Sequence, residues 1–155
     1  MSRAAAAVAV LAAGLLQATI GTRFEVRGVL PNLVLVAVVV ITWTLGPRMG
    51  LVLACLGGLL LDLGTAGPVG PHALALLGGP YLIGWLSRRV QPPSAVVVAV
   101  TAVPATLMYC AVLFGLQVPP VETLAAAIYN TVLVLFAFVL VRPLSLGRIS
   151  RRAQA

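Results

Sequence analysis

The sequence predicts an all-α integral membrane protein, a bundle of six transmembrane helices with both termini in the cytoplasm. The chain has 155 residues, of which 61% are hydrophobic and only 8% are charged. Its mean hydropathy is +1.13. A typical soluble domain has about 25% charged residues, and a small domain in water keeps a large fraction of its surface exposed. Lipid is therefore the expected solvent for most of these side chains.

The apolar residues fall into six runs, separated by breaks that are charged or rich in Pro and Gly. Within a single transmembrane domain over 1–155, helices are expected over residues 4–20, 30–45, 49–63, 72–86, 95–116 and 121–141, followed by a basic cytoplasmic tail over 142–155. A spanning helix needs about 20 residues, with a range of about 17–25. The third and fourth helices are shorter, which leaves open whether they span fully. Pro31 suits the first turn of the second helix, where its missing N–H would have no partner.

The arginines give an independent test of this helix count. All the basic residues except His72 are arginine, and the net charge is +7. With the N-terminus inside, six spans place only Arg23 and Arg27 outside and the other eight arginines in the cytoplasm, as the positive-inside rule requires. The basic excess therefore indicates topology and contact with lipid headgroups, and no nucleic-acid partner is expected. More apolar runs follow the first one, which is interpreted as an uncleaved helix rather than a signal peptide.

Small residues recur at helical spacing in three of the predicted helices. Four positions of the third helix share one face because they are four residues apart: Gly50, Ala54, Gly58 and Asp62. The first and sixth helices have similar series: Ala5, Ala9 and Ala13, and Thr123, Ala127 and Thr131. Small residues let helices approach closely in lipid. Each face is either a packing surface within the chain or a surface for a partner's helix.

Asp62 is the one acid inside an apolar run. An aspartate at a helix centre costs about 2.5–3.5 kcal/mol on insertion scales, and less near the interface, so its carboxylate needs a partner. The candidates are His72, the free backbone amides that begin the fourth helix, and Arg23 or Arg27. We hypothesise that Asp62 fastens the turn between the third and fourth helices; the alternative is an interface carboxylate in water. Unchanged thermal stability of Asp62→Leu in detergent would contradict the structural role.

No enzyme active site is expected, and no cofactor or metal site. Asp62 and His72 lack the nucleophile, base and oxyanion group that a hydrolytic site combines, and they are too few for a metal that takes three or four ligands. Cys55 and Cys110 lie in separate apolar runs and are interpreted as small apolar side chains.

An ordered set of features marks the stretch over residues 30–89, about 40% of the chain. In chain order they are Pro31-Asn32 before a long apolar helix, a basic turn at Arg48, a Gly-spaced helix ending at Asp62, a Gly/Pro loop with Gly70, then His72 and Tyr81. This set resembles the rod shape-determining protein MreD family. The resemblance implies a non-enzymatic subunit of the bacterial elongasome, in the cytoplasmic (inner) membrane, that helps organise peptidoglycan synthesis and cell shape.

The resemblance also implies partners. Family members associate with MreC, a single-span protein, and through it with the MreB filament, a SEDS glycosyltransferase and a class B penicillin-binding protein. The family is similar to the six-helix substrate-binding subunits of energy-coupling-factor transporters, in which an Ala-xxx-Ala face on the first helix often meets the transport partner. Ala5, Ala9 and Ala13 are candidates for such a face.

The alternative function is a small-solute-binding subunit of a membrane transporter. The residues Gly78–Pro80, Tyr109 and Asn130 would then line a cavity, since broken helices line ligand cavities in transporters. A ligand retained through purification would favour this function over an assembly subunit.

Overall fold

The structure, a computed structural model, describes residues 2–20, 23, 30–65, 67–90, 94–114 and 120–152. These residues form six α-helices: α1 (Arg3–Ile20), α2 (Leu33–Leu45), α3 (Pro47–Leu63), α4 (Pro71–Leu86), α5 (Ala95–Phe114) and α6 (Pro120–Arg152). At least two of them contain segments long and apolar enough to cross a membrane, Ala95–Leu113 in α5 and Val121–Val141 in α6. α1 and α2 are shorter apolar helices. The expectation of an all-helical fold is confirmed.

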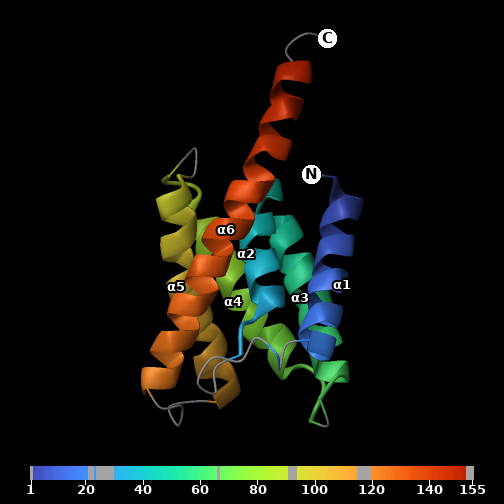
Figure 1. The fold of residues 1–155 in the computed structure, drawn as a ribbon, viewed down its shortest axis with the longest axis vertical. Coiled ribbons are helices and arrows are strands. Elements are labelled where there is room, and N and C mark those ends of the chain that lie inside the picture. Colours follow the sequence, from blue (N-terminus) through green and yellow to red (C-terminus); the bar gives the residue numbers. More distant parts are fainter. Residues whose placement is uncertain are drawn as a thin grey trace.

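α2 is the central helix of the bundle (Figure 1). It contacts each of the other five, which follow one another around it in the order α1, α3, α4, α5 and α6. Val34, Val38 and Val39 of α2 are at most 1% exposed. Its sequence is apolar on every side apart from Thr42 and Thr44, so it suits a position without contact with water.

The ring around α2 is not closed. Among the described residues, α6 and α1 make no contact with each other, although each contacts α2. Leu33, Ala37 and Thr44 are half-buried and share one face of α2, at helical spacing. Since every other pair of successive helices in the ring is in contact, this face lies at the space between α1 and α6, here called the α1–α6 opening.

Successive helices run in opposite directions, so both chain ends lie at the same end of the bundle (Figure 1). This end includes the start of α1, the α2–α3 turn and the end of α4, which carry Arg3, Arg48, Arg88 and Arg89. It is called the arginine end below. The α3–α4 turn lies at the opposite end.

Most helix bounds agree with the expectations within two residues, and two differ by more. Pro31 lies before α2 rather than in its first turn, because Asn32 caps the helix: its Oδ1 accepts a hydrogen bond from the Leu35 N–H at 2.9 Å. α6 continues to Arg152 instead of ending at Val141. A change from apolar to basic residues indicates where a helix leaves lipid, but it does not interrupt backbone hydrogen bonding. The last three tail positions, 153–155, lie outside the described residues.

Candidate functional site

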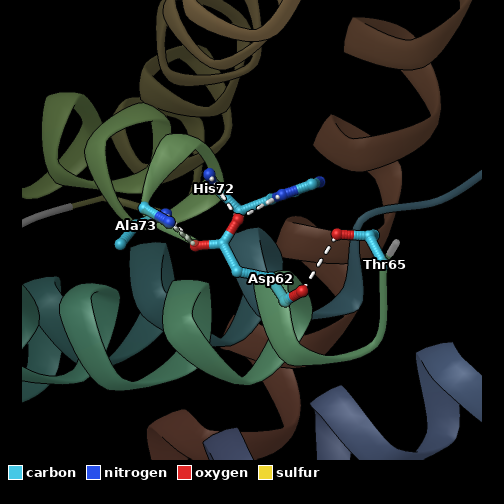
Figure 2. A network of polar contacts seen from close by, with 5 residues as sticks. Asp62, Thr65, His72 and Ala73 are labelled. Atoms are coloured by element: carbon cyan, nitrogen blue, oxygen red, sulfur yellow. Dashed lines mark hydrogen bonds and ion pairs between the residues drawn. The ribbon is translucent and has the colours of Figure 1, made fainter. Parts of the chain in front are cut away.

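A buried carboxylate joins α3 to α4 at the turn between them (Figure 2). Asp62, in the last turn of α3, is 1% exposed. Its Oδ1 accepts hydrogen bonds from the backbone N–H of His72 at 3.0 Å, and its Oδ2 from those of Gly70 at 2.9 Å and Ala73 at 3.4 Å. The first amides of a helix have no partner within the helix, and the helix dipole favours a negative charge there. Asp62 therefore acts as an N-terminal cap supplied by the preceding helix.

The His72 side chain completes the ring of donors around this carboxylate. Its Nδ1 lies 2.7 Å from Asp62 Oδ1, and the imidazole is 23% exposed. Of the other candidate partners, Arg23 is exposed, and Arg27 lies outside the described residues. A carboxylate away from water is stable only when its lone pairs are satisfied. Three amides and an imidazole, from Gly70, His72 and Ala73, meet that need.

Four local features of the sequence shape this turn. Gly70, just before α4, has φ +126°, a conformation that L side chains rarely adopt. Pro71 follows in the first helical turn, where a missing N–H is harmless. A Cβ on Gly58 would overlap the backbone N and Cα of Ala73, so only glycine lets α3 approach the start of α4 this closely. The Thr65 hydroxyl also donates to the Asp62 carbonyl oxygen, at 3.0 Å.

A second set of polar contacts connects α2, α5 and α6. The Asn32 N–H donates to Asn130 Oδ1 at 3.0 Å, and Asn130 Nδ2 donates to Thr106 Oγ1 at 3.2 Å. All three residues are at most 6% exposed. Because the Asn130 amide uses both its donor and its acceptor, it fixes the register of α6 against α2 and α5.

Tyr109 lies between these two sets. It is 8% exposed, and its ring is tilted 54° to the His72 ring, with centroids 6.1 Å apart. Within the described part of the chain, Asn32 Nδ2 is the one buried side-chain polar atom without a hydrogen-bond partner. These two sets bring Asn32, Asp62, His72, Thr106, Tyr109 and Asn130 into the half of the bundle that holds the α3–α4 turn.

The small-residue face of α3 is used inside the chain. Gly50, Ala54, Gly58 and Asp62 are all buried. A Cβ on Gly50 would overlap the Thr42 side chain of α2. This face therefore packs against α2 and α4 and is not accessible to a partner in this structure.

The small residues of α1 have a different environment. Ala5 and Ala9 are exposed, and Ala13 is half-buried. Gly14 meets Leu60 of α3 and is about 100° further round the helix than Ala13. The Ala5–Ala9–Ala13 face is therefore turned away from α3, towards the α1–α6 opening. The remaining candidate, Tyr81 of α4, is 75% exposed.

Sequence reasoning missed two residues at the meeting point of α1, α2 and α3. A Cβ on Gly57 would lie 2.6 Å from Val34 Cγ1 and 2.9 Å from Val10 Cγ1, so this glycine lets three helices converge. Gln17 Oε1 accepts a hydrogen bond from the Val34 N–H at 3.3 Å and so satisfies an amide in the first turn of α2. Gln17 could have been noticed in the sequence, because it is a polar residue within a mostly apolar run.

A family model described as rod shape-determining protein MreD matches residues 4–146. The match extends from the first turn of α1 into α6 and therefore includes all six helices. No curated protein matches the chain, and no solved structure matches it. The similarity to energy-coupling-factor transport subunits expected from the sequence thus stays a prediction.

Proposed function

The chain belongs to the MreD family of rod shape-determining proteins, and from this premise we propose that it is a multi-pass inner-membrane subunit that binds a single-span, MreC-like protein. The family is non-enzymatic, so the contribution of this subunit is binding. Holding the partner's helix in one tilt or one dimeric state would favour an active geometry of the peptidoglycan synthases. Such an effect requires different affinities for two states of the partner.

The α1–α6 opening is the proposed site for the partner's helix. Among the described helices, α1 and α6 are the one pair of neighbours in the ring that do not touch, and the half-buried face of Leu33, Ala37 and Thr44 lies between them. One wall is the Ala5–Ala9–Ala13 face of α1. Without a hydrophobic driving force in lipid, helices associate through close packing of small residues. A helix placed here would contact α1, α2 and α6 together.

The proposed orientation puts the arginine end in the cytoplasm. Arg3, Arg48, Arg88 and Arg89 all belong to segments at that end, and positive residues are retained on the cytoplasmic side of membranes. The α6 extension beyond Val141 starts from the same end. The MreB filament, the SEDS glycosyltransferase and the class B penicillin-binding protein are reached indirectly, through the single-span partner.

Site-specific photo-crosslinking in native membranes tests this proposal. A photoreactive residue at position 9 replaces the exposed Ala9 and faces the α1–α6 opening. The control position is Val100 of α5, which is 61% exposed and belongs to a helix that does not contact α1 among the described residues. We expect a crosslink to a single-span cell-wall protein from position 9 and none from position 100. Equal crosslinking from both positions, or crosslinking from position 100 alone, would contradict the assigned surface. Ala54 and Ala127 also belong to small-residue series, but they are 0% and 1% exposed, so a crosslinker at either position would not reach a partner.

The packing of the bundle does not favour the alternative, a solute-binding transport subunit. The residues expected to line a cavity have other roles: Asn130 is bonded to Asn32 and Thr106, and the Tyr109 ring lies beside the His72 ring. α4 continues through Pro80 as one helix and is not broken there. The centre of the bundle, where a ligand would bind, is occupied by α2.

A further inference from the structure

Exposed aromatic residues follow one face of α4 towards the arginine end. Tyr81 is 75% exposed and Trp85 is 52% exposed. Leu74, 65% exposed, and Gly78 continue the same face towards the other end, because the positions 74, 78, 81 and 85 are spaced by three or four residues. Met108 of α5 borders this face, since a Cβ on Gly78 would lie 2.9 Å from Met108 Cε. These four positions of α4 are called the α4 stripe.

Three exposed arginines belong to segments at the end of the bundle where the α4 stripe ends. The guanidinium carbon of Arg89 lies 4.2 Å from the centroid of the Trp85 ring, a cation–π contact. Arg88 precedes it in the same turn. The α2–α3 turn packs against the last turn of α4, because a Cβ on Gly84 would lie 3.0 Å from Pro47 Cβ. Arg48 follows Pro47 and so belongs to the same corner of the bundle.

This corner has no counter-charge within the described part of the chain. The two acids described there are Asp62, beside the α3–α4 turn, and Glu122, at the start of α6, and both lie at the opposite end of the bundle. Stacking on Trp85 holds the Arg89 guanidinium beside the ring. Its planar set of donors matches the oxygens of a phosphate group.

We propose that Arg48, Arg88 and Arg89 bind the phosphate headgroup of an anionic phospholipid whose acyl chain lies along the α4 stripe. The charge of the corner requires an anion, and the adjoining stripe requires a long apolar group. A soluble anion would bind the arginines but leave the α4 stripe uncovered. An acidic peptide would also bind the arginines, but its charged residues would not cover the apolar stripe. An anionic diacyl lipid satisfies both surfaces. The site lies on the outer face of α4 and is separate from the α1–α6 opening.

Fluorescence quenching of Trp85 by brominated lipids tests this site. The full chain carries Trp43→Phe, so that Trp85 is its one tryptophan. It is reconstituted in vesicles of phosphatidylglycerol and phosphatidylcholine, in which one or the other lipid is brominated at the same bromine content. We expect quenching to show an enrichment of phosphatidylglycerol around Trp85 of about threefold or more at low salt, falling as salt rises. The enrichment should fall to near onefold in the triple variant Arg48→Gln/Arg88→Gln/Arg89→Gln. It should be intermediate in Arg89→Lys, which keeps the charge but loses the planar guanidinium.

The matched control removes the same charge elsewhere at the arginine end. Arg148→Gln/Arg151→Gln/Arg152→Gln should keep the enrichment, and all variants should keep the helix content and melting temperature of the Trp43→Phe parent. Equal quenching by the two lipids in the parent, or equal loss in the two triple variants, would overturn the proposal. A third result would also overturn it: the two brominated lipids quench Trp85 equally, and the parent binds soluble polyglutamate whereas the variant lacking Arg48, Arg88 and Arg89 does not. That result would assign the corner to an acidic protein.

Discussion

Asp62 Oδ1 lies 3.0 Å from the backbone nitrogen of His72 and 2.7 Å from its Nδ1, so one residue of α4 holds the same carboxylate oxygen with both its main chain and its side chain. Together with the bonds from Gly70 and Ala73 to Oδ2, this pair fixes how α3 turns into α4.

Asp62→Leu should destabilise the protein by about 3 kcal/mol, the scale seen when one partner of a buried charged group is removed. The substitution removes the acceptor for the amides of Gly70, His72 and Ala73. The measurement is thermal unfolding in detergent. Glu122→Gln is the matched control, because it removes the same charge from an exposed acid and should have little effect. Equal melting temperatures for the Asp62 variant and the wild type would contradict the capping role.

Gly58→Ala should separate α3 from α4. Its Cβ would overlap the backbone of Ala73, which cannot rotate away as a side chain can, and overpacking of this kind costs about 1–3 kcal/mol. Gly64→Ala is the control: its Cβ would come no closer than 3.4 Å to any neighbour, and its φ is −83°. A difference in melting temperature between the two variants is expected in detergent. If both melted alike, the close approach at Gly58 would not matter for stability.

Asn130→Val should loosen α6, because it leaves the buried N–H of Asn32 and the hydroxyl of Thr106 without this partner. The expected loss is about 1 kcal/mol, since hydrogen bonds between membrane helices are individually modest. Thr131→Val is the control, because the Thr131 hydroxyl bonds to Ala127 of its own helix at 2.6 Å. Hydrogen exchange of α6 amides in detergent should rise for the first variant only. Equal exchange in both variants would show that Asn130 does not fix the helix.

Gly70→Ala should cost about 1–3 kcal/mol through backbone strain alone. The φ of Gly70 is +126°, but a Cβ there would have nothing within 4 Å, so no steric contact adds to the effect. Gly67→Ala, in the same loop, is the control, because glycine 67 has no such φ and a Cβ there would be 3.9 Å from its nearest neighbour. Cells that depend on the Gly70 variant should round at elevated temperature if the turn is needed for shape determination. A Gly70 variant as stable as the Gly67 variant would mean that the loop adapts freely.

Much of the fold could be predicted from the sequence because lipid imposes a simple rule. An apolar run in hydrocarbon must satisfy its own backbone hydrogen bonds, and a helix does so within the run. The helical runs, the breaks between them and the importance of Asp62 and His72 all follow from reading residues in order. The start of α2 was misread because Pro31 and Asn32 both suit a helix start, and the side-chain bond from Asn32 to the Leu35 N–H decides between them only in three dimensions.

By itself, the sequence determined a helical membrane protein of the MreD family and predicted that eight of its ten arginines lie on one side of the membrane. Hydropathy and charge are sums over local residues and do not depend on which helices become neighbours. Only the tertiary structure decided that α2 lies at the centre of the bundle. It also decided that the Gly50–Gly58 face of α3 is buried against other helices, whereas Ala5 and Ala9 of α1 are exposed. The small-residue pattern is the same on both helices, and which of the two faces is buried depends on contacts with residues far away in the chain.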